Sequence, residues 1–301
     1  MRAVAERFLV TGALGCLGAW TCKLLVEQDI AVVAYDLGDD PHRLRLIMEP
    51  GSIDEITFLG GDVTDLAHLE RTLAEHAITH VVHLAALQVP FCRADPVRGA
   101  RVNVLGTVNV FEAAKRIGLT TTVAYASSAA VYDARAQIAP ATLYGVYKLA
   151  NEGTARVYAQ DAGISSIGLR PFSVYGPARD QGVTSTPTQA MLAAARGEAY
   201  TISFGGRTQL HYAPDVARAF ILAARSDPAG AAVYNLGGPV TSIAELIDEI
   251  ASVVPGAKID LEDVALPFPD ALPEPWFDVP LTPLGQGVRE TIDLFRAKAA
   301  A

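Results

Sequence analysis

The chain has 301 residues, half of them hydrophobic, and a formal net charge of −9. This length allows a large core, arranged as one α/β domain with an appended lobe or as two domains that share a cleft. Lys and Arg form no cluster, which argues against nucleic acid as a partner, and no run of 18 apolar residues predicts a membrane span. Three cysteines without a paired motif and six histidines without metal-ligand spacing favour a soluble cytoplasmic protein with neither disulfides nor a metal site.

The first predicted elements flank a glycine-rich turn. Residues 8–10 are an apolar strand, Gly12, Gly15 and Gly18 follow at intervals of three, and residues 19–26 have a helical apolar pattern. A strand that continues as a helix leaves unpaired N–H groups at the positive end of the helix dipole, where a pyrophosphate binds. Gly12 permits the tight turn, Gly15 lets phosphate approach the backbone, and Gly18 lets helix and strand pack closely. Ordinary glycine-rich turns share this spacing, so the interpretation as a pyrophosphate site depends on residues further along the chain.

The second predicted strand, residues 31–36, ends in Asp36, about 20 residues after the glycine turn. A carboxylate there accepts hydrogen bonds from the adenosine ribose hydroxyls and repels a 2′-phosphate, which favours NAD over NADP. Arg43 and Arg45 lie just downstream and could weaken that preference. The alternative is a solvated strand end without function.

Strands and helices continue to alternate as far as Pro171. Asp65 is a plausible N-cap, and the predicted elements are strands 56–59, 79–84, 121–126 and 164–170 and helices 65–76, 96–117 and 142–162. This alternation predicts a Rossmann-type, doubly wound parallel sheet with helices on both faces.

After Pro171 the pattern loosens. We predict helices 185–196, 214–224, 242–253 (with a Ser242–Glu245 capping box) and one from 284, strands 200–204 and 233–236, and an extended proline-rich segment 266–283. Residues 1–170 would form the NAD-binding domain, with returns from about 207–238. Residues 171–301 would form mainly a smaller α/β substrate lobe.

The catalytic candidates are Ser128, Tyr144 and Lys148. Tyr144 and Lys148 stand four apart and so project from one helix face. A phenol has a pKa near 10, so acting as a base near pH 7 requires about 4 kcal/mol of phenolate stabilisation, part of which a neighbouring ammonium supplies. Ser128, at a strand end, would hold the substrate oxygen. A Tyr–Lys pair at this spacing, taken alone, is more often an ordinary exposed pair. Because this one follows a glycine turn and Asp36 in the same sequence, the catalytic interpretation is favoured.

Together these motifs resemble the extended short-chain dehydrogenase/reductase family, in particular its NAD-dependent epimerase/dehydratase group. The resemblance covers residues 8 to about 236 and rests on segments 11–18, 36, 62–63, 83–86, 103–107, 127–132, 144–148 and 169–177. It implies that Tyr144 is the catalytic acid/base, that Lys148 lowers its pKa and binds the nicotinamide ribose, and that Ser128 orients the substrate. It also implies NAD contacts by Gly12, Gly15, Cys16, Leu17, Gly18, Asp36, Asp62, Val63, Leu84, Ala85, Ala86, Asn103, Tyr144, Lys148 and Phe172.

The chain departs from this family where substrate is handled. Ala129 and Ala130 replace the acidic pair that dehydratases carry, Ser173 stands where nucleotide-sugar epimerases usually have Asn, and Thr208 stands at the expected diphosphate-binding Arg. The loop between Ser128 and Tyr144 is also short. These changes favour a smaller carbohydrate-like substrate and net dehydrogenation or reduction. The candidate substrate residues are Gln88, Ser127, Ser128, Ser173, Arg207, Gln209 and His211.

The leading hypothesis is an NAD-dependent oxidoreductase that transfers hydride at a secondary hydroxyl or ketone of a sugar or sugar-derived molecule. One alternative is a nucleotide-sugar (UDP-hexose type) 4-epimerase with tightly bound NAD. Another, of a different class, is a non-catalytic NAD-bound regulator. The family resemblance further implies a homodimer.

Overall fold

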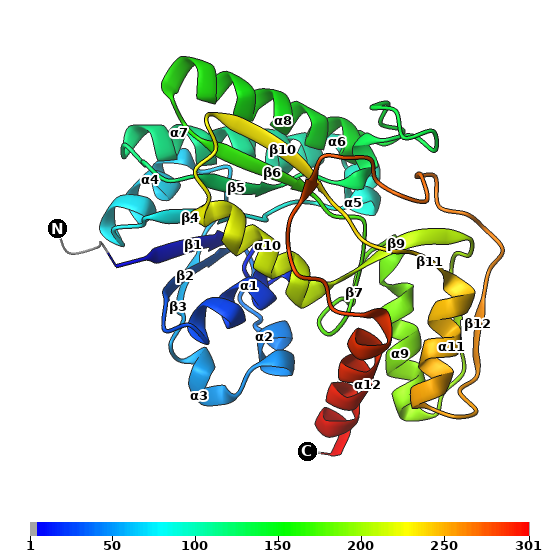
Figure 1. The fold of residues 1–301 in the computed structure, drawn as a ribbon. Coiled ribbons are helices and arrows are strands. Elements are labelled where there is room, and N and C mark those ends of the chain that lie inside the picture. Colours follow the sequence, from blue (N-terminus) through cyan, green and yellow to red (C-terminus); the bar gives the residue numbers. More distant parts are fainter. Residues whose placement is uncertain (1–4, 301) are drawn as a thin grey trace.

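A parallel sheet of eight strands forms the centre of the computed structural model, which describes residues 5–300 (Figure 1). The strand order is β13–β10–β6–β5–β4–β1–β2–β3, and every pairing is parallel. The bounds are β1 Arg7–Thr11, β2 Ala31–Asp36, β3 Thr57–Gly60, β4 His80–His83, β5 Val123–Ala126, β6 Ser166–Arg170, β10 Ala231–Leu236 and β13 Trp276–Phe277. The doubly wound parallel sheet predicted from the sequence is confirmed.

Helices cover both faces of this sheet. On one face, α1 (Cys16–Val26) and α10 (Ala213–Arg225) pack together against the inner strands, with Phe8 and Phe220 fully buried between them and the sheet. On the other face lie α4 (Leu66–Glu75), α7 (Gly106–Arg116) and α8 (Leu143–Ala162) around Tyr35, Phe111 and Tyr125. The strands therefore bury side chains on both faces of the sheet, where they meet apolar side chains of the covering helices.

The helix predicted over 96–117 is wrong as a single element. The chain instead forms α5 (Val89–Ala94), α6 (Pro96–Ala100), a π-helical segment η1 (Arg101–Leu105) and then α7. The wider π turn carries the buried Asn103, whose amide accepts a hydrogen bond from Leu87 N (2.9 Å) and donates one to Leu87 O (3.0 Å). Hydrogen bonding to a distant loop has overridden the local helical pattern.

A second, smaller lobe is built after β6. It contains the sheet β11–β9–β7 (β7 Ser173–Tyr175, β9 Arg207–Tyr212, β11 Val240–Ser242) and the pair β12–β8 (β8 Tyr200–Ile202, β12 Ile259–Leu261). Its helices α9 (Thr186–Arg196), α11 (Ile243–Val253) and α12 (Leu284–Ala300) stand side by side in Figure 1 and share one apolar core. The predicted Ser242–Glu245 capping box is present. Most strands of this lobe have only three residues, too few to show a pattern in the sequence.

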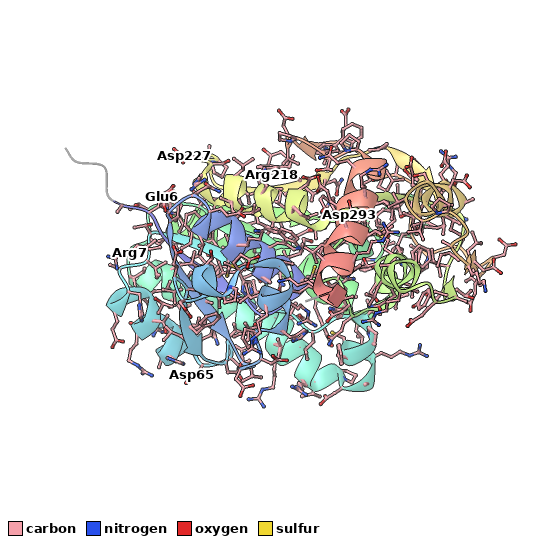
Figure 2. The ribbon with its side chains drawn as sticks, turned by 90° about the horizontal axis from the view of Figure 1, so that it is seen from below. Glu6, Arg7, Asp65, Arg218, Asp227 and Asp293 are labelled. Atoms are coloured by element: carbon pink, nitrogen blue, oxygen red, sulfur yellow. The ribbon has the colours of Figure 1, made fainter. Side chains whose placement is uncertain are left out.

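The proline-rich segment 266–283 is extended, as predicted, but it also supplies β13, which pairs with β10 at the edge of the large sheet. Four short helices complete the fold: α2 (His42–Ile47), α3 (Pro50–Ile53), η2 (Ala129–Val131) and η3 (Val183–Ser185). Figure 2, seen from below, shows charged side chains such as Asp65 and Asp293 on the outer surface of the helices. Between residues 5 and 300, no helix combines the length and apolarity that crossing a membrane requires.

Candidate active site

A cleft of about 720 Å³ follows the carboxyl ends of the parallel strands. It lies where the strand order reverses, with β1 and β2 on one side and β4, β5 and β6 on the other. Open α/β sheets bind ligands at such a switch point, because the loops after neighbouring strands diverge there. The cleft is continuous from the glycine turn past Ser128 and Tyr144 to Phe172.

The glycine turn between β1 and α1 is shaped by close backbone contacts. Gly12 has a φ of +68°, and a Cβ on it would lie 2.6 Å from Ala85 N. A Cβ on Gly18 would lie 2.1 Å from the Gly12 carbonyl oxygen, so this helix can approach the strand only with glycine there. Gly15 is the N-cap of α1 and no side chain caps the helix start, so backbone N–H groups remain for an anion. The turn therefore fits the pyrophosphate of a dinucleotide.

Cys16, Leu17 and Gly18, in the first turn of α1, line the cleft as the sequence predicts. Burial raises the pKa of the Cys16 thiol to about 12, against the opposing charges of Arg179 and Arg43. Cys16 is therefore a neutral thiol near pH 7 and serves as a small wall residue.

Asp36 ends β2 beside this turn, where the ribose-binding carboxylate was predicted. Its Oδ2 accepts a hydrogen bond from Leu14 N (2.9 Å) and its Oδ1 one from Gly38 N (3.1 Å). Arg43 also lines the cleft, but its guanidinium donates to Leu14 O (2.8 Å) and to Asp180 Oδ1 (2.9 Å). Arg45 is exposed and near Asp40. Both arginines are thus bound to other groups and are not free to attract a 2′-phosphate. The preference for NAD over NADP, based on Asp36, stays a prediction.

Most of the other predicted cofactor residues also line the cleft: Asp62, Val63, Leu84, Ala85, Ala86 and Phe172. Asn103 differs, because its side chain is buried behind the wall and braces the loop at Leu87 instead. Its carboxamide also donates to Cys92 Sγ (3.1 Å). Asn103 therefore positions the loop that follows β4 and does not itself reach the cleft.

Ser128, Tyr144 and Lys148 converge on one wall of the cleft. Thr142 caps α8 through a hydrogen bond to Gly145 N (3.1 Å), which places Tyr144 in the first turn and Lys148 one turn later. Ser128 follows β5, and its hydroxyl accepts a hydrogen bond from Ala130 N (3.1 Å). The Lys148 ammonium lies 5.5 Å from the centre of the Tyr144 ring and donates to Ala126 O (2.7 Å).

The pKa values of this pair are set mainly by burial. Burial raises the pKa of the Tyr144 phenol, while its contact with the Ser128 hydroxyl and the charge of Arg179 lower it. Burial also lowers the pKa of Lys148 to about 8, so its ammonium is still charged at pH 7. The pair therefore holds a protonated phenol beside a cation.

The predicted substrate residues divide into two groups. Gln88, Ser127, Ser128 and Ser173 line the cleft, although the Ser127 hydroxyl donates to Glu152 (2.5 Å) and Ser173 pairs with Thr208 (3.2 Å). Arg207, Gln209 and His211 do not line it.

The three residues outside the cleft lie on β9 and have other neighbours. Gln209 binds Gly238 O (2.7 Å) and Leu272 N (2.8 Å), and His211 Nδ1 accepts from Phe172 N (3.0 Å). Arg207, at the start of β9, is exposed. Gln209 and His211 therefore hold the segments that form the wall.

Sequence analysis missed several cleft residues. Arg179, Thr184 and Phe268 line the end beyond Tyr144, and the Phe268 ring packs edge-on against Phe172 with centroids 5.8 Å apart. Arg179 lies two residues after the segment 169–177, so its position near a recognised motif was an available signal. Phe268 had no such signal in the sequence, because it reaches the cleft only when the proline-rich segment has folded.

The switch-point cleft, the glycine turn and the acidic end of β2 define a dinucleotide-binding protein with a Rossmann-type sheet. The chain belongs to the NAD dependent epimerase/dehydratase family, whose model matches residues 8–237. Family membership confirms the resemblance inferred from the sequence motifs and the class of cofactor, NAD.

Three relatives illustrate the range of similarity. UDP-glucose 4-epimerase of Mycolicibacterium smegmatis is 30% identical, with 97% of this chain and 99% of that protein aligned. UDP-glucuronate 4-epimerase 2 of Arabidopsis thaliana is 31% identical over 56% of this chain, and the match spans only 42% of the plant protein. The solved structure of MoeE5 in complex with UDP-glucose and NAD has a TM-score of 0.79 at 28% identity and covers 98% of this chain and 100% of its own.

Proposed function

We propose that this protein transfers hydride between NAD and a secondary hydroxyl or ketone of a sugar or sugar-derived substrate, with Tyr144 as general acid/base. The observation that carries the proposal is the placement of Ser128, Tyr144 and Lys148 on the same cleft as the glycine turn. When bound, NAD supplies the hydride acceptor or donor. The first turn of α1 would hold its pyrophosphate, Asp36 its adenosine ribose, and Lys148 its second ribose.

The chain's own groups handle the proton. In the reduction direction, the neutral Tyr144 phenol donates its proton to the substrate carbonyl oxygen, and its burial-raised pKa keeps that proton available at pH 7. In the oxidation direction, Tyr144 must take a proton from the hydroxyl. The Lys148 ammonium, the Ser128 hydroxyl and the charge of Arg179 then stabilise the phenolate. Ser128 holds the reacting oxygen beside the phenol.

The second candidate is a nucleotide-sugar 4-epimerase. It is supported by the alignment of nearly the whole chain with a UDP-glucose 4-epimerase. Against it stands Thr208, at the position expected for a diphosphate-binding arginine: its side chain is buried and paired with Ser173, so it offers no cation. An epimerase would retain NAD and release no net NADH, whereas a dehydrogenase accumulates NADH.

The test measures NADH absorbance during a screen of free sugars, sugar acids, polyols and nucleotide sugars, with product analysis by chromatography. Tyr144→Phe should reduce turnover by at least about a hundredfold, the usual share of general acid/base catalysis. NAD affinity, measured by calorimetry, should stay within about twofold. Retained turnover in Tyr144→Phe would refute the assignment, and a screen without any hydride transfer or epimerised product would revive a non-catalytic regulator.

The proposal includes a homodimer in the cytoplasm. Val97, Leu105, Val146 and Val157 are large apolar side chains left exposed on α6, η1 and α8, and such side chains are common at subunit interfaces. All three cysteines are free thiols, as in reducing compartments. Light scattering of the purified protein measures the mass, and a monomer at micromolar concentration would contradict the dimer.

A further inference from the structure

Arg179 is a partly buried cation at the cleft whose charge is not neutralised within residues 5–300. Its Nη2 donates to Thr184 Oγ1 (3.1 Å), while its Nε is buried and has no hydrogen-bond partner. No carboxylate of the described residues lies within 4.0 Å of its guanidinium. Arginine rarely remains partly buried without a neutralising anion, because desolvating a charge costs free energy.

The adjacent carboxylate does not pair with Arg179 because two other residues occupy it. Asp180 Oδ1 accepts from Arg43 Nε (2.9 Å), and its Oδ2 lies 3.2 Å from His42 Nε2. These contacts hold Asp180 toward α2. Both residues line the cleft, but the Asp180 carboxylate is taken up by Arg43 and His42 and does not neutralise Arg179.

Polar groups gather around this guanidinium. A Cβ on Gly182 would lie 2.2 Å from Gln88 Oε1 and 3.2 Å from Arg179 Nη2. The loop thus lies close to the ends of both side chains, and the φ of +95° at residue 182 favours glycine there. Gln88, Arg179 and Thr184 therefore form one polar cluster on the wall of the cleft, in which Arg179 is the cation. The positive charge of Arg179 reaches both ends of that wall, since it lowers the pKa of Cys16 and of Tyr144.

We propose that Arg179 is an anion-binding residue that contacts a phosphate or carboxylate group of the bound ligand. Two sources share this chemistry: an anionic group of the substrate and the pyrophosphate of NAD. The substrate is the favoured source, because the uncapped first turn of α1 already supplies donors for the pyrophosphate. For the substrate, the inference deepens the proposed function: the sugar is a sugar acid or a phosphorylated sugar, and not a neutral one.

Binding measurements test this without any assay of turnover. Calorimetry gives the Kd of NAD, and then, on the NAD-saturated protein, the Kd values of D-glucuronate against D-glucose and of UDP against uridine. The variants are Arg179→Gln, which removes the charge, and Arg179→Lys, which keeps it but loses the planar fork. Arg196→Gln is the matched control, because Arg196 is exposed at the end of α9 outside the cleft.

We expect Arg179→Gln to weaken at least one anionic probe by about tenfold or more, equivalent to about 1.4 kcal/mol. The neutral counterparts should change by less than about twofold, Arg179→Lys should lose less, and Arg196→Gln should match the wild type. A tenfold loss confined to NAD would assign the anion to the cofactor pyrophosphate. If the wild type binds none of the four probes, the effect of Arg179→Gln on NAD affinity alone decides whether Arg179 binds an anion.

Arg179→Gln that matches the wild type for NAD and for every probe would overturn the proposal. These outcomes are independent of the Tyr144→Phe result, since they require binding and no hydride transfer. The anion site and the catalytic assignment can therefore fail separately.

Discussion

The two ends of the cleft differ in how their polar groups are satisfied. At the cofactor end, the buried His83 lies between β1 and α7 and uses both ring nitrogens, with Thr11 Oγ1 at 2.7 Å and Thr107 Oγ1 at 3.0 Å. Behind the wall of the substrate end, His211 is equally buried, but among residues 5–300 only its Nδ1 has a partner, the Phe172 N–H, and the Arg179 Nε has none. A regular sheet supplies neighbours at fixed spacing, whereas the loop that carries Arg179 leaves its Nε free at the wall of the cleft.

The two ends of the cleft also differ in rigidity. The cofactor end is shaped by backbone against backbone, as at Gly12 and Gly18, and backbone atoms cannot rotate away. The substrate end is shaped by side chains such as Phe172 and Phe268, which can change rotamer. Substitutions at the first end should therefore affect folding most, and substitutions at the second should mainly affect specificity.

The largest expected effect is that of Gly18→Ala. Its Cβ would lie 2.1 Å from the Gly12 carbonyl, so α1 must move off the turn, and overpacking of this kind costs about 1–3 kcal/mol of unfolding free energy. NAD affinity should fall with it. Gly15→Ala is the matched variant, because its Cβ meets only the Gly12 carbonyl, at 3.2 Å. It should weaken NAD binding with less loss of stability. Urea unfolding and calorimetry measure both, and equal stabilities for the two variants would contradict the backbone argument.

An intermediate effect on the free energy of unfolding is expected at low pH, where His211 would be protonated in the unfolded chain. Burial lowers its pKa to about 4, against about 6.5 in an unfolded chain. Between these values the unfolded state binds more protons, so the contribution to stability is full above pH 6.5 and is lost as the pH falls toward 4. From pH 7 to pH 5 this amounts to about 2 kcal/mol.

His211→Asn tests this prediction, because its carboxamide oxygen can accept from Phe172 N but does not titrate. Urea unfolding at pH 7 and pH 5 should show a smaller loss for the variant than for the wild type. His83→Asn makes the same test at the cofactor end, because burial lowers the pKa of His83 to about 3. Identical pH slopes for wild type and His211→Asn would show that His211 does not remain neutral in the folded protein.

The smallest effect is expected where the two ends meet, at the Arg43–Asp180 ion pair. The Asp180 side chain is 38% exposed, and ion pairs at such sites contribute about 0.2–1 kcal/mol. Asp180→Asn should therefore change NAD affinity by less than about fivefold, and the freed Arg43 should slightly improve NADP binding. Asp161→Asn, exposed at the end of α8, is the charge control. A tenfold change in NAD affinity would mean that this pair governs cofactor retention.

Local pattern determined most of the large sheet and the cofactor end of the site. Each strand from β1 to β6, and β10, begins and ends within two residues of its prediction. The glycine turn, Asp36 and the Tyr144–Lys148 pair are each defined within one turn or one strand. The glycine turn and Asp36 follow β1 and β2 directly, so the parallel pairing of these strands brings both to the carboxyl edge of the sheet.

Tertiary structure alone decided the rest. The π-helical segment exists because Asn103 bonds to Leu87, and β13 exists because a proline-rich segment returns to β10. Gln209 and His211, expected at the substrate, bind segments that fold against β9. Arg179 and Phe268 reach the cleft from loops. These outcomes depend on contacts between residues far apart in sequence, which hydrophobic periodicity and motif spacing do not encode.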